Sequence, residues 1–180
     1  DGVYVDLSLQ YTDSFKEHLF AFANNIYNPE GGMHVTGFKM ALTRSLNDYA
    51  KKNGFLKEKD GAMTSDDLKE GLTAVISVKL ANPQFEGQTK AKLGNAEVRG
   101  IVSSVVSEGL AEYMETRPAD AKAMLEKCLL TVRARIAARA AKDAVIRKGA
   151  LEGMTLPGKL ADCSTKDITR SELYIVEGDS

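Results

Sequence analysis

The sequence predicts an α+β fold, in which a mostly antiparallel sheet carries helices on one face and a long helix follows. Two apolar periodicities lead to this class. Residues 3–11 alternate apolar and polar side chains, and the segments 15–23 and 74–80 place apolar residues on one face, at every second position from Leu19 to Ala23 and from Ala74 to Leu80. Both patterns are typical of strands with one buried face. The segments that start near residues 35, 98 and 118 repeat their apolar residues every three or four positions, as on one face of an α-helix.

The first two strands are expected to pair as a hairpin. Apolar residues alternate from Val3 to Tyr11, and the turn sequence YTDS leads into a second strand at about Phe15–Ala23. The stretch NNIYNPEGG is then expected to be a loop, because Asn, Pro and Gly favour turns. A third strand is expected over Ala74–Leu80, and a last short one over Leu173–Val176.

Two helices and one isolated turn are expected around the third strand. The first helix covers residues 35–49 and stops near Gly54, and the second begins after Asn95, whose side chain can cap it. Between the helices, the polar stretch TSDDLKEG is expected to hold one helical turn capped by Thr64 or Ser65.

A third, long helix is expected to start at Pro118, a residue that suits a first helical turn, and to continue to about Lys148. Residues 118–150 carry eight basic and three acidic side chains, a net charge of +5 in a chain whose net charge is −1. Such a helix suits a DNA-facing surface, but a merely solvated helix has the same pattern. Its expected apolar stripe consists of Ala121, Leu125, Cys128, Leu129, Val132 and Ile136.

Composition excludes several classes of protein. Charged residues make up 27% of the 180 residues, which argues against disorder and against a wholly basic nucleic-acid binder. The apolar runs fall far short of the roughly 18 residues of a membrane span, and the first residues do not resemble a signal peptide. Cys128 and Cys163 form no CxxC motif, which favours reduced thiols in a cytosolic protein. Both ends of the chain read as cuts, so we expect a piece of a longer protein.

The stretch ANPQFEGQTKAKLGN places a lysine and an amide on a glycine-containing loop. Lys90 offers three donors on a flexible stem, which suits a phosphate, and Gln88 adds a neutral donor beside Gly87. A solvated lysine on an ordinary surface loop is the alternative, and these residues alone favour it. No GxxxxGK[ST] sequence occurs, so a P-loop is excluded.

Two further stretches are candidate sites. Glu177, in LYIVEGDS, follows an apolar strand-like run and precedes a glycine, a position where α/β folds place metal-binding or catalytic carboxylates. An exposed turn is the alternative. The glycine turn of EGGMHVTGF could present backbone N–H groups to an anion, or it could be a tight connection with His34 at the start of a helix.

Taken together, these stretches resemble one family. EGGMHVTGFK, LTAVISVKLANPQFEGQTKAKLGN, LPGKLADC and the terminal VEGDS stand in the order and spacing seen in bacterial type IIA topoisomerases. Essentially the whole chain resembles the transducer domain of DNA gyrase B, or of its topoisomerase IV equivalent. One departure is Met33, which stands where the family usually has Thr.

The resemblance implies a fold and an organisation. The family fold is the two-layer sandwich of ribosomal protein S5 domain 2, here with a long C-terminal helix. Residues 1–150 would be the transducer domain with its basic helix, and residues 151–180 a linker and the first strand of a truncated Toprim domain. The family's ATPase domain would precede Asp1, and the rest of the Toprim site would follow Ser180.

The resemblance also implies site residues and partners. Lys90, assisted by Gln88, would contact the ATP γ-phosphate in the neighbouring ATPase domain, and Glu177 would be a catalytic Toprim carboxylate that helps to hold Mg²⁺. The complete cytoplasmic enzyme would be an ATP-hydrolysing DNA topoisomerase. Its partners would be DNA, a second copy of the gyrase B chain, and gyrase A or the topoisomerase IV protein that corresponds to it. This chain alone is expected to be inactive, because it completes neither site.

Three alternatives stay open at this point. The chain could belong to topoisomerase IV rather than gyrase, because the region that distinguishes them lies in the partner protein. It could be a non-enzymatic nucleic-acid-binding module with an S5-like fold, which the basic helix also suits. A Toprim nuclease or primase fragment is a third reading, but it leaves the QTK stretch unexplained.

Overall fold

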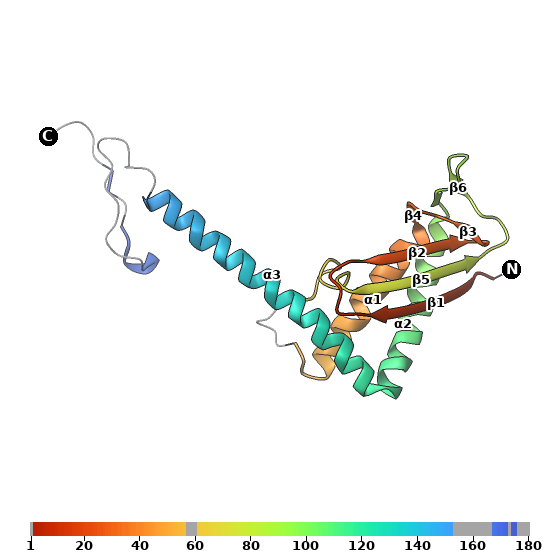
Figure 1. Ribbon diagram of the computed structural model, residues 1–180, viewed down its shortest axis with the longest axis horizontal. Helices are drawn as coiled ribbons and strands as arrows, with labels where there is room; N and C mark the ends of the chain where they lie inside the picture. Colours follow the sequence, from red (N-terminus) through yellow and green to blue (C-terminus); the bar gives the residue numbers. More distant parts are fainter. Residues whose placement is uncertain (1, 57–60, 153–166, 173, 176–180) are drawn as a thin grey trace. The chain divides into compact units, whose positions relative to one another are not determined.

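A computed structural model describes residues 2–56, 61–152, 167–172 and 174–175, and within these ranges all side chains except those of 146–152 and 168 (Figure 1). The chain divides into two compact units, Asp1–Arg135 and Ile136–Ser180. Among the described helices, none is both long enough and apolar enough to cross a membrane.

The main sheet has the strand order β1-β5-β2-β3. Strand β1 (Tyr4–Tyr11) pairs antiparallel with β5 (Leu72–Lys79), and β5 pairs parallel with β2 (His18–Ala23). The short β3 (Ile26–Tyr27) completes the sheet antiparallel to β2. The α+β class is therefore confirmed, with a mostly antiparallel sheet in which β2 and β5 form the parallel pair.

The expected hairpin of the first two strands is wrong, because β5 lies between them. Alternate residues of β5 are fully buried, so this strand occupies the centre of the sheet and contacts both neighbours. The connection after β1 therefore crosses the end of β5, where the N–H of Thr12 donates to the carbonyl of Gly71 at 2.9 Å. Turn-forming residues predict a local pair, whereas burial of the most apolar strand decides the actual order.

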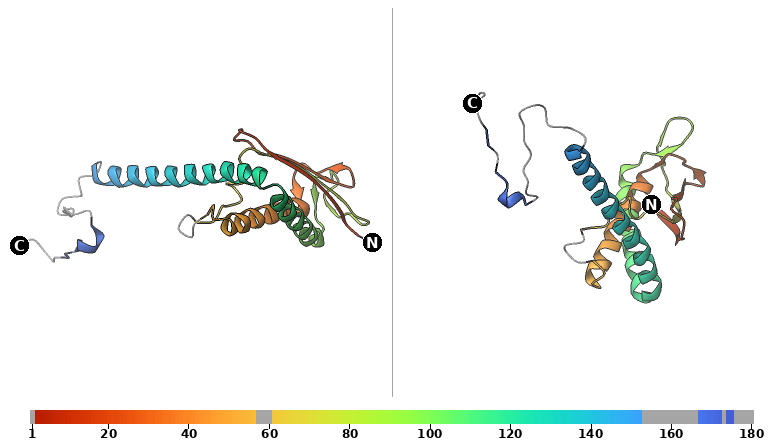
Figure 2. Two further views of the ribbon diagram at one scale, coloured as in Figure 1. Left: turned by 90° about the horizontal axis from the view of Figure 1, so that it is seen from below. Right: turned by 60° about the vertical axis from the view of Figure 1, so that its left-hand side comes forward.

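Two helices cover one face of this sheet (Figure 2). Helix α1 (Met33–Lys52) and helix α2 (Ala96–Thr116) pack against each other, and α1 also packs against β5. The two helices approach closely at Gly37, where an added Cβ would lie 2.5 Å from the carbonyl oxygen of Arg99. The centre of the core is formed by Phe38, Leu46, Ile76, Val98 and Val102, all of which are fully buried.

A second, small sheet has the order β4-β7-β6. Strand β4 (Gly31–Gly32) pairs parallel with β7 (Lys92–Leu93), which pairs antiparallel with β6 (Phe85–Glu86). Strand β4 leads directly into α1, so this small sheet joins the start of α1 to the β6–β7 hairpin.

Helix α3 runs from Pro118 to Glu152, close to the expected bounds. Within the first unit it buries Ala121, Leu125, Cys128 and Val132, as the apolar stripe predicts. The prediction that Ile136 belongs to the buried stripe is wrong, because 47% of its surface is exposed.

A 3₁₀ turn at Ile168–Arg170 is described near the C-terminus. The expected last strand is only partly described. Leu173 and Val176 lie outside the described residues, and Tyr174 and Ile175 adopt no strand conformation.

Candidate functional site

The β6–β7 hairpin projects away from the main sheet (Figure 1). Its connection, between Glu86 and Lys92, carries the predicted Lys90. Gly87 and Lys90 both have left-handed backbones, with φ of +74° and +54°. The N–H of Lys90 points to the carbonyl of Gly87 at 3.4 Å, which closes a tight turn. Gln88, Thr89 and Lys90 are all exposed. A non-glycine residue with positive φ is uncommon, and such conformations are concentrated at functional sites.

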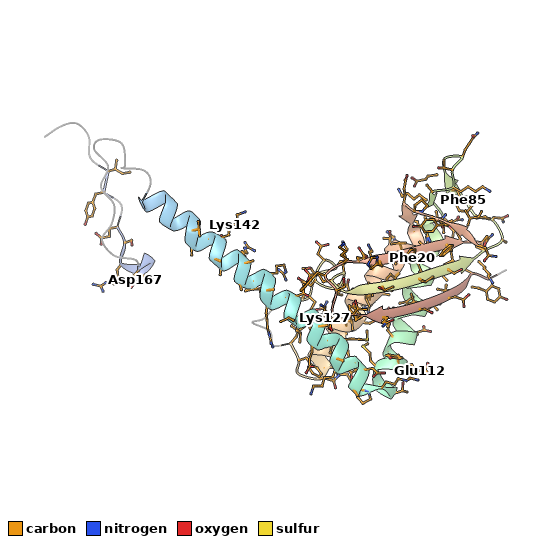
Figure 3. The ribbon with its side chains drawn as sticks, in the orientation of Figure 1. Phe20, Phe85, Glu112, Lys127, Lys142 and Asp167 are labelled. Atoms are coloured by element: carbon orange, nitrogen blue, oxygen red, sulfur yellow. The ribbon has the colours of Figure 1, made fainter. Side chains whose placement is uncertain are left out.

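The ammonium group of Lys90 is available to a ligand. It lies 5.8 Å from the ring centroid of Phe85, labelled in Figure 3, and pairs with no carboxylate of any residue the structure describes. The neighbouring Lys92 differs, because its Nζ lies 3.0 Å from Oε2 of Glu86. The hairpin therefore holds one lysine that is neutralised locally and one that is not.

Buried polar side chains fix the base of the hairpin. Asn28, which is 1% exposed, donates from Nδ2 to the carbonyl of Lys90 at 2.7 Å. The N–H of Glu30 donates to the carbonyl of Ala91 at 3.0 Å. On the other arm, Oδ1 of Asn95 accepts from the N–H of Gln84 at 2.6 Å. The exposed turn thus stands on a rigid support.

Asn95 combines a predicted position with an unpredicted role. It precedes α2 as expected, but its side chain does not cap the helix. Besides accepting from Gln84, it donates to the carbonyl of Asn82 at 3.1 Å. Its amide therefore braces the hairpin, and a capping pattern in the sequence cannot distinguish the two uses.

The glycine turn before α1 forms a tight connection. A Cβ added to Gly32 would lie 2.3 Å from the carbonyl oxygen of Leu93. The start of α1 is therefore in contact with the β7 backbone. His34 follows in the first turn of the helix and is fully buried, and burial lowers its pKa to about 4. The imidazole is accordingly neutral at neutral pH.

The described basic residues of α3 differ in how the fold uses their charge. Arg135 forms a two-point ion pair with the buried Asp67, through Nε to Oδ1 at 2.6 Å and Nη2 to Oδ2 at 3.0 Å. Arg133, Arg139 and Lys142, the last labelled in Figure 3, are exposed. Among the described side chains, Arg133, Arg139 and Lys142 are therefore exposed and suit a nucleic-acid surface, whereas the charge of Arg135 is already paired with Asp67.

The predicted metal ligand Glu177 lies outside the described residues. Among the residues that are described, no three His, Cys, Asp or Glu side chains are grouped so as to hold a metal ion. The exposed ammonium of Lys90 fits a phosphate, whereas nothing in the described ranges offers a Mg²⁺ donor set.

Comparison with protein families and curated relatives gives consistent matches. A family model described as DNA gyrase B matches residues 1–144. The chain is 57% identical to the DNA gyrase B protein of Clostridium acetobutylicum over 98% of its own length and 28% of the relative. It is 52% identical to the DNA gyrase B protein of Bacillus mycoides over its full length and 45% of that relative.

Solved structures agree with this match. The 43K ATPase domain of Thermus thermophilus gyrase B, in complex with an aminocoumarin, has a TM-score of 0.73 and 47% identity over 79% of this chain and 38% of that one. A topoisomerase IV ATP-binding domain of Francisella tularensis has a TM-score of 0.67 and 33% identity over 76% of this chain and 38% of its own. The chain spans less than half the length of each of these four proteins.

Proposed function

Because the chain belongs to the DNA gyrase B family, we propose that it is the transducer region of an ATP-dependent type II DNA topoisomerase, and that it couples the nucleotide state to DNA strand passage. The observation that carries the proposal is Lys90, an exposed lysine that no described carboxylate neutralises, at the tip of a rigidly supported hairpin.

Lys90 acts as a donor to the terminal phosphate of ATP bound in a neighbouring domain. An ammonium group and an anionic oxygen form a charge-assisted hydrogen bond, which is stronger than a neutral one. This contact exists with a triphosphate and is lost with a diphosphate. The position of the hairpin therefore reports whether the terminal phosphate is present, and Gln88 contributes a weaker, neutral donor.

Residues 1–150 form the transducer, and residues 151–180 lead into a Toprim domain in which Glu177 helps to hold Mg²⁺. The metal would supply charge stabilisation during DNA strand cleavage and rejoining. The exposed basic side chains of α3, Arg133, Arg139 and Lys142, contact the DNA backbone without sequence preference. The partners of the complete enzyme are DNA, gyrase A and a second copy of the gyrase B chain.

Identity to the solved structures does not separate gyrase from topoisomerase IV. Two gyrase B structures are 47% and 26% identical to the chain, and the topoisomerase IV structure is 33% identical. Both enzymes use the same proposed contact, so the test below applies to either.

The test is steady-state ATP turnover by the full-length protein in its assembled enzyme. Lys90→Ala should lower turnover at least about tenfold, since each 1.36 kcal/mol of lost transition-state stabilisation is a factor of ten. Gln88→Ala should lower it less. Lys92→Ala is the matched control, because this lysine is already paired with Glu86. If Lys90→Ala keeps wild-type turnover, the hairpin is an ordinary surface loop and the proposed function is contradicted.

A further inference from the structure

We propose that residues 63–71, the relay segment, transmit movement from α1 to α3, with Asn47 and Arg135 as the two contact points. The inference rests on the proposed coupling function and names the route by which the coupling leaves the hairpin. All of its contacts lie within the first compact unit.

The first contact joins α1 to the beginning of the relay segment. Asn47 is buried, and its amide pairs with the backbone of Met63 in both directions. Nδ2 donates to the carbonyl of Met63 at 3.0 Å, and Oδ1 accepts from the N–H of Met63 at 2.9 Å. Met63 is itself only 2% exposed. A paired buried contact of this kind moves as one piece with its helix, because separating it would leave polar groups without partners.

The second contact joins the relay segment to α3. The carboxylate of Asp67 is 1% exposed and has a partner on each oxygen. Arg135 donates to both oxygens, and Oδ2 also accepts from the N–H and the hydroxyl of Thr64, each at 2.7 Å. Burial alone raises the pKa of Asp67, but the hydrogen bonds from Arg135 and Thr64 outweigh it and hold the pKa below its usual value. The carboxylate is therefore ionised and fully partnered at neutral pH.

The contacts lie where α3 ceases to be buried. One turn before Arg135, the hydroxyl of Thr131 donates to Oε2 of Glu70 at 3.1 Å, so two successive turns of the helix hold the same segment. From residue 136 to residue 145, every described side chain is exposed. Arg135 therefore closes the docked part of α3, and a shift of the relay segment acts on the helix at this point.

The other end of the route begins at the hairpin. Strand β7 follows the turn that carries Lys90 and pairs with β4, and Gly32 of β4 precedes the first residue of α1. Asn47 lies 15 residues further along the chain than Gly32. A straight helix of that length spans about 22 Å and transmits displacement with little bending. Packed and hydrogen-bonded elements thus connect the Lys90 turn to Arg135 without interruption.

The experiment uses the full-length protein in its assembled enzyme and measures two rates, ATP turnover and strand passage per ATP hydrolysed. In Arg135→Gln and in Asp67→Asn, strand passage per ATP should fall about fivefold or more, the usual size of a coupling between sites. ATP turnover should stay within about twofold of wild type, because neither residue belongs to the proposed nucleotide contact. The double variant should be no worse than either single one, since both interrupt the same route.

Two further variants separate coupling from charge and from folding. Arg135→Lys keeps the charge but loses the two-point geometry, so the relay predicts partial loss, whereas a DNA-contact role predicts wild-type behaviour. Arg117→Gln is the matched control, because this arginine has an exposed ion pair with Asp120 at 4.0 Å. It should change neither rate.

Several outcomes would overturn the relay. One is a parallel loss of ATP turnover and strand passage in Arg135→Lys, which indicates general damage to the fold. Another is an effect of Arg135→Gln without one of Asp67→Asn, which indicates a DNA contact. If Lys90→Ala abolishes turnover while both relay variants behave like Arg117→Gln, the relay fails and the proposed function stands. If Lys90→Ala has wild-type ATP turnover, the proposed function fails, whatever the relay variants show.

Discussion

The Lys90 turn and the middle of α3 both present basic residues, but the fold uses them in opposite ways. Lys90 is exposed, and no described carboxylate pairs with it. Arg135 is held at two points by a carboxylate that is 1% exposed. The sequence shows both as positive charges near polar residues. A charge is available to a ligand only where the fold has not already neutralised it.

The difference extends to the support beneath each residue. The Lys90 turn stands on backbone pairing and on two buried amides, Asn28 and Asn95. Arg135 instead contributes to the support itself, because it holds the buried carboxylate of Asp67 in the segment between α1 and β5. We therefore expect changes at the Lys90 turn to alter function with little change in stability, and changes around Arg135 to alter both.

The largest expected effect is a difference in stability between a substitution at the base of the hairpin and one at its tip. Gly32→Ala should destabilise the chain by at least about 3 kcal/mol, because its Cβ would overlap the backbone of Leu93. Gly87→Ala is the matched control, since its nearest neighbour would be Oγ1 of Thr89 at 3.9 Å. It should cost about 1 kcal/mol, the strain of a left-handed alanine.

Urea unfolding followed by circular dichroism measures both variants. Equal losses would mean that the contact between β4 and β7 is no more rigid than the exposed turn. That result would remove the reason for treating the base of the hairpin as a fixed support.

The next effect is a difference in the free energy of unfolding between variants of Asp67 and Lys90. Asp67→Asn should lower the free energy of unfolding by about 2 kcal/mol, because it removes the charge from a hydrogen-bonded buried carboxylate. Lys90→Ala should leave unfolding unchanged within about 0.5 kcal/mol, as for most surface substitutions. A comparable loss in Lys90→Ala would show that this lysine is structural and not available to a ligand.

The pH dependence of the same comparison has a definite sign. The pKa of Asp67 lies below its ordinary value in the folded chain. The unfolded state therefore binds the proton more readily, and the stabilisation is present above about pH 4 and is lost as pH falls through the folded pKa. The difference between wild type and Asp67→Asn should accordingly shrink in acid. A difference that grows below about pH 4 would contradict the ionised, partnered carboxylate.

Much of the fold could be predicted from periodicity, and the failures have physical causes. The three long strands, the helices and the length of α3 followed from apolar spacing. The two-residue strands β3, β4, β6 and β7 were not predicted, and β3 and β4 lie in the stretch NNIYNPEGG that was expected to be a loop. The hairpin prediction failed because the pairing of β1 and β2 with β5 depends on burial between segments far apart in the sequence, which local turn signals do not contain. The burial of Ile136 was predicted wrongly for a similar reason. The apolar spacing of the sequence continues to this residue, although its side chain is exposed.

For the candidate site, the sequence indicated Lys90 and Gln88 but not the residues that support them. Asn28 was read only as part of a loop, and Asn95 as a helix cap. The two-point contact of Arg135 with Asp67 joins residues 68 positions apart, and no local motif marks it. The only available signal was the presence of an acidic turn, TSDDLKEG, in a chain that also has a basic helix.

Amide hydrogen exchange at residues 87–90 of the full-length protein tests most directly whether the turn senses the terminal phosphate. A non-hydrolysable triphosphate analogue should slow exchange at least about tenfold relative to the diphosphate, because stabilising an ordered turn by about 1.4 kcal/mol changes its opening equilibrium by that factor. In Lys90→Ala the two nucleotides should give the same rates. Equal rates with triphosphate and diphosphate in the wild-type protein would contradict a phosphate contact at Lys90.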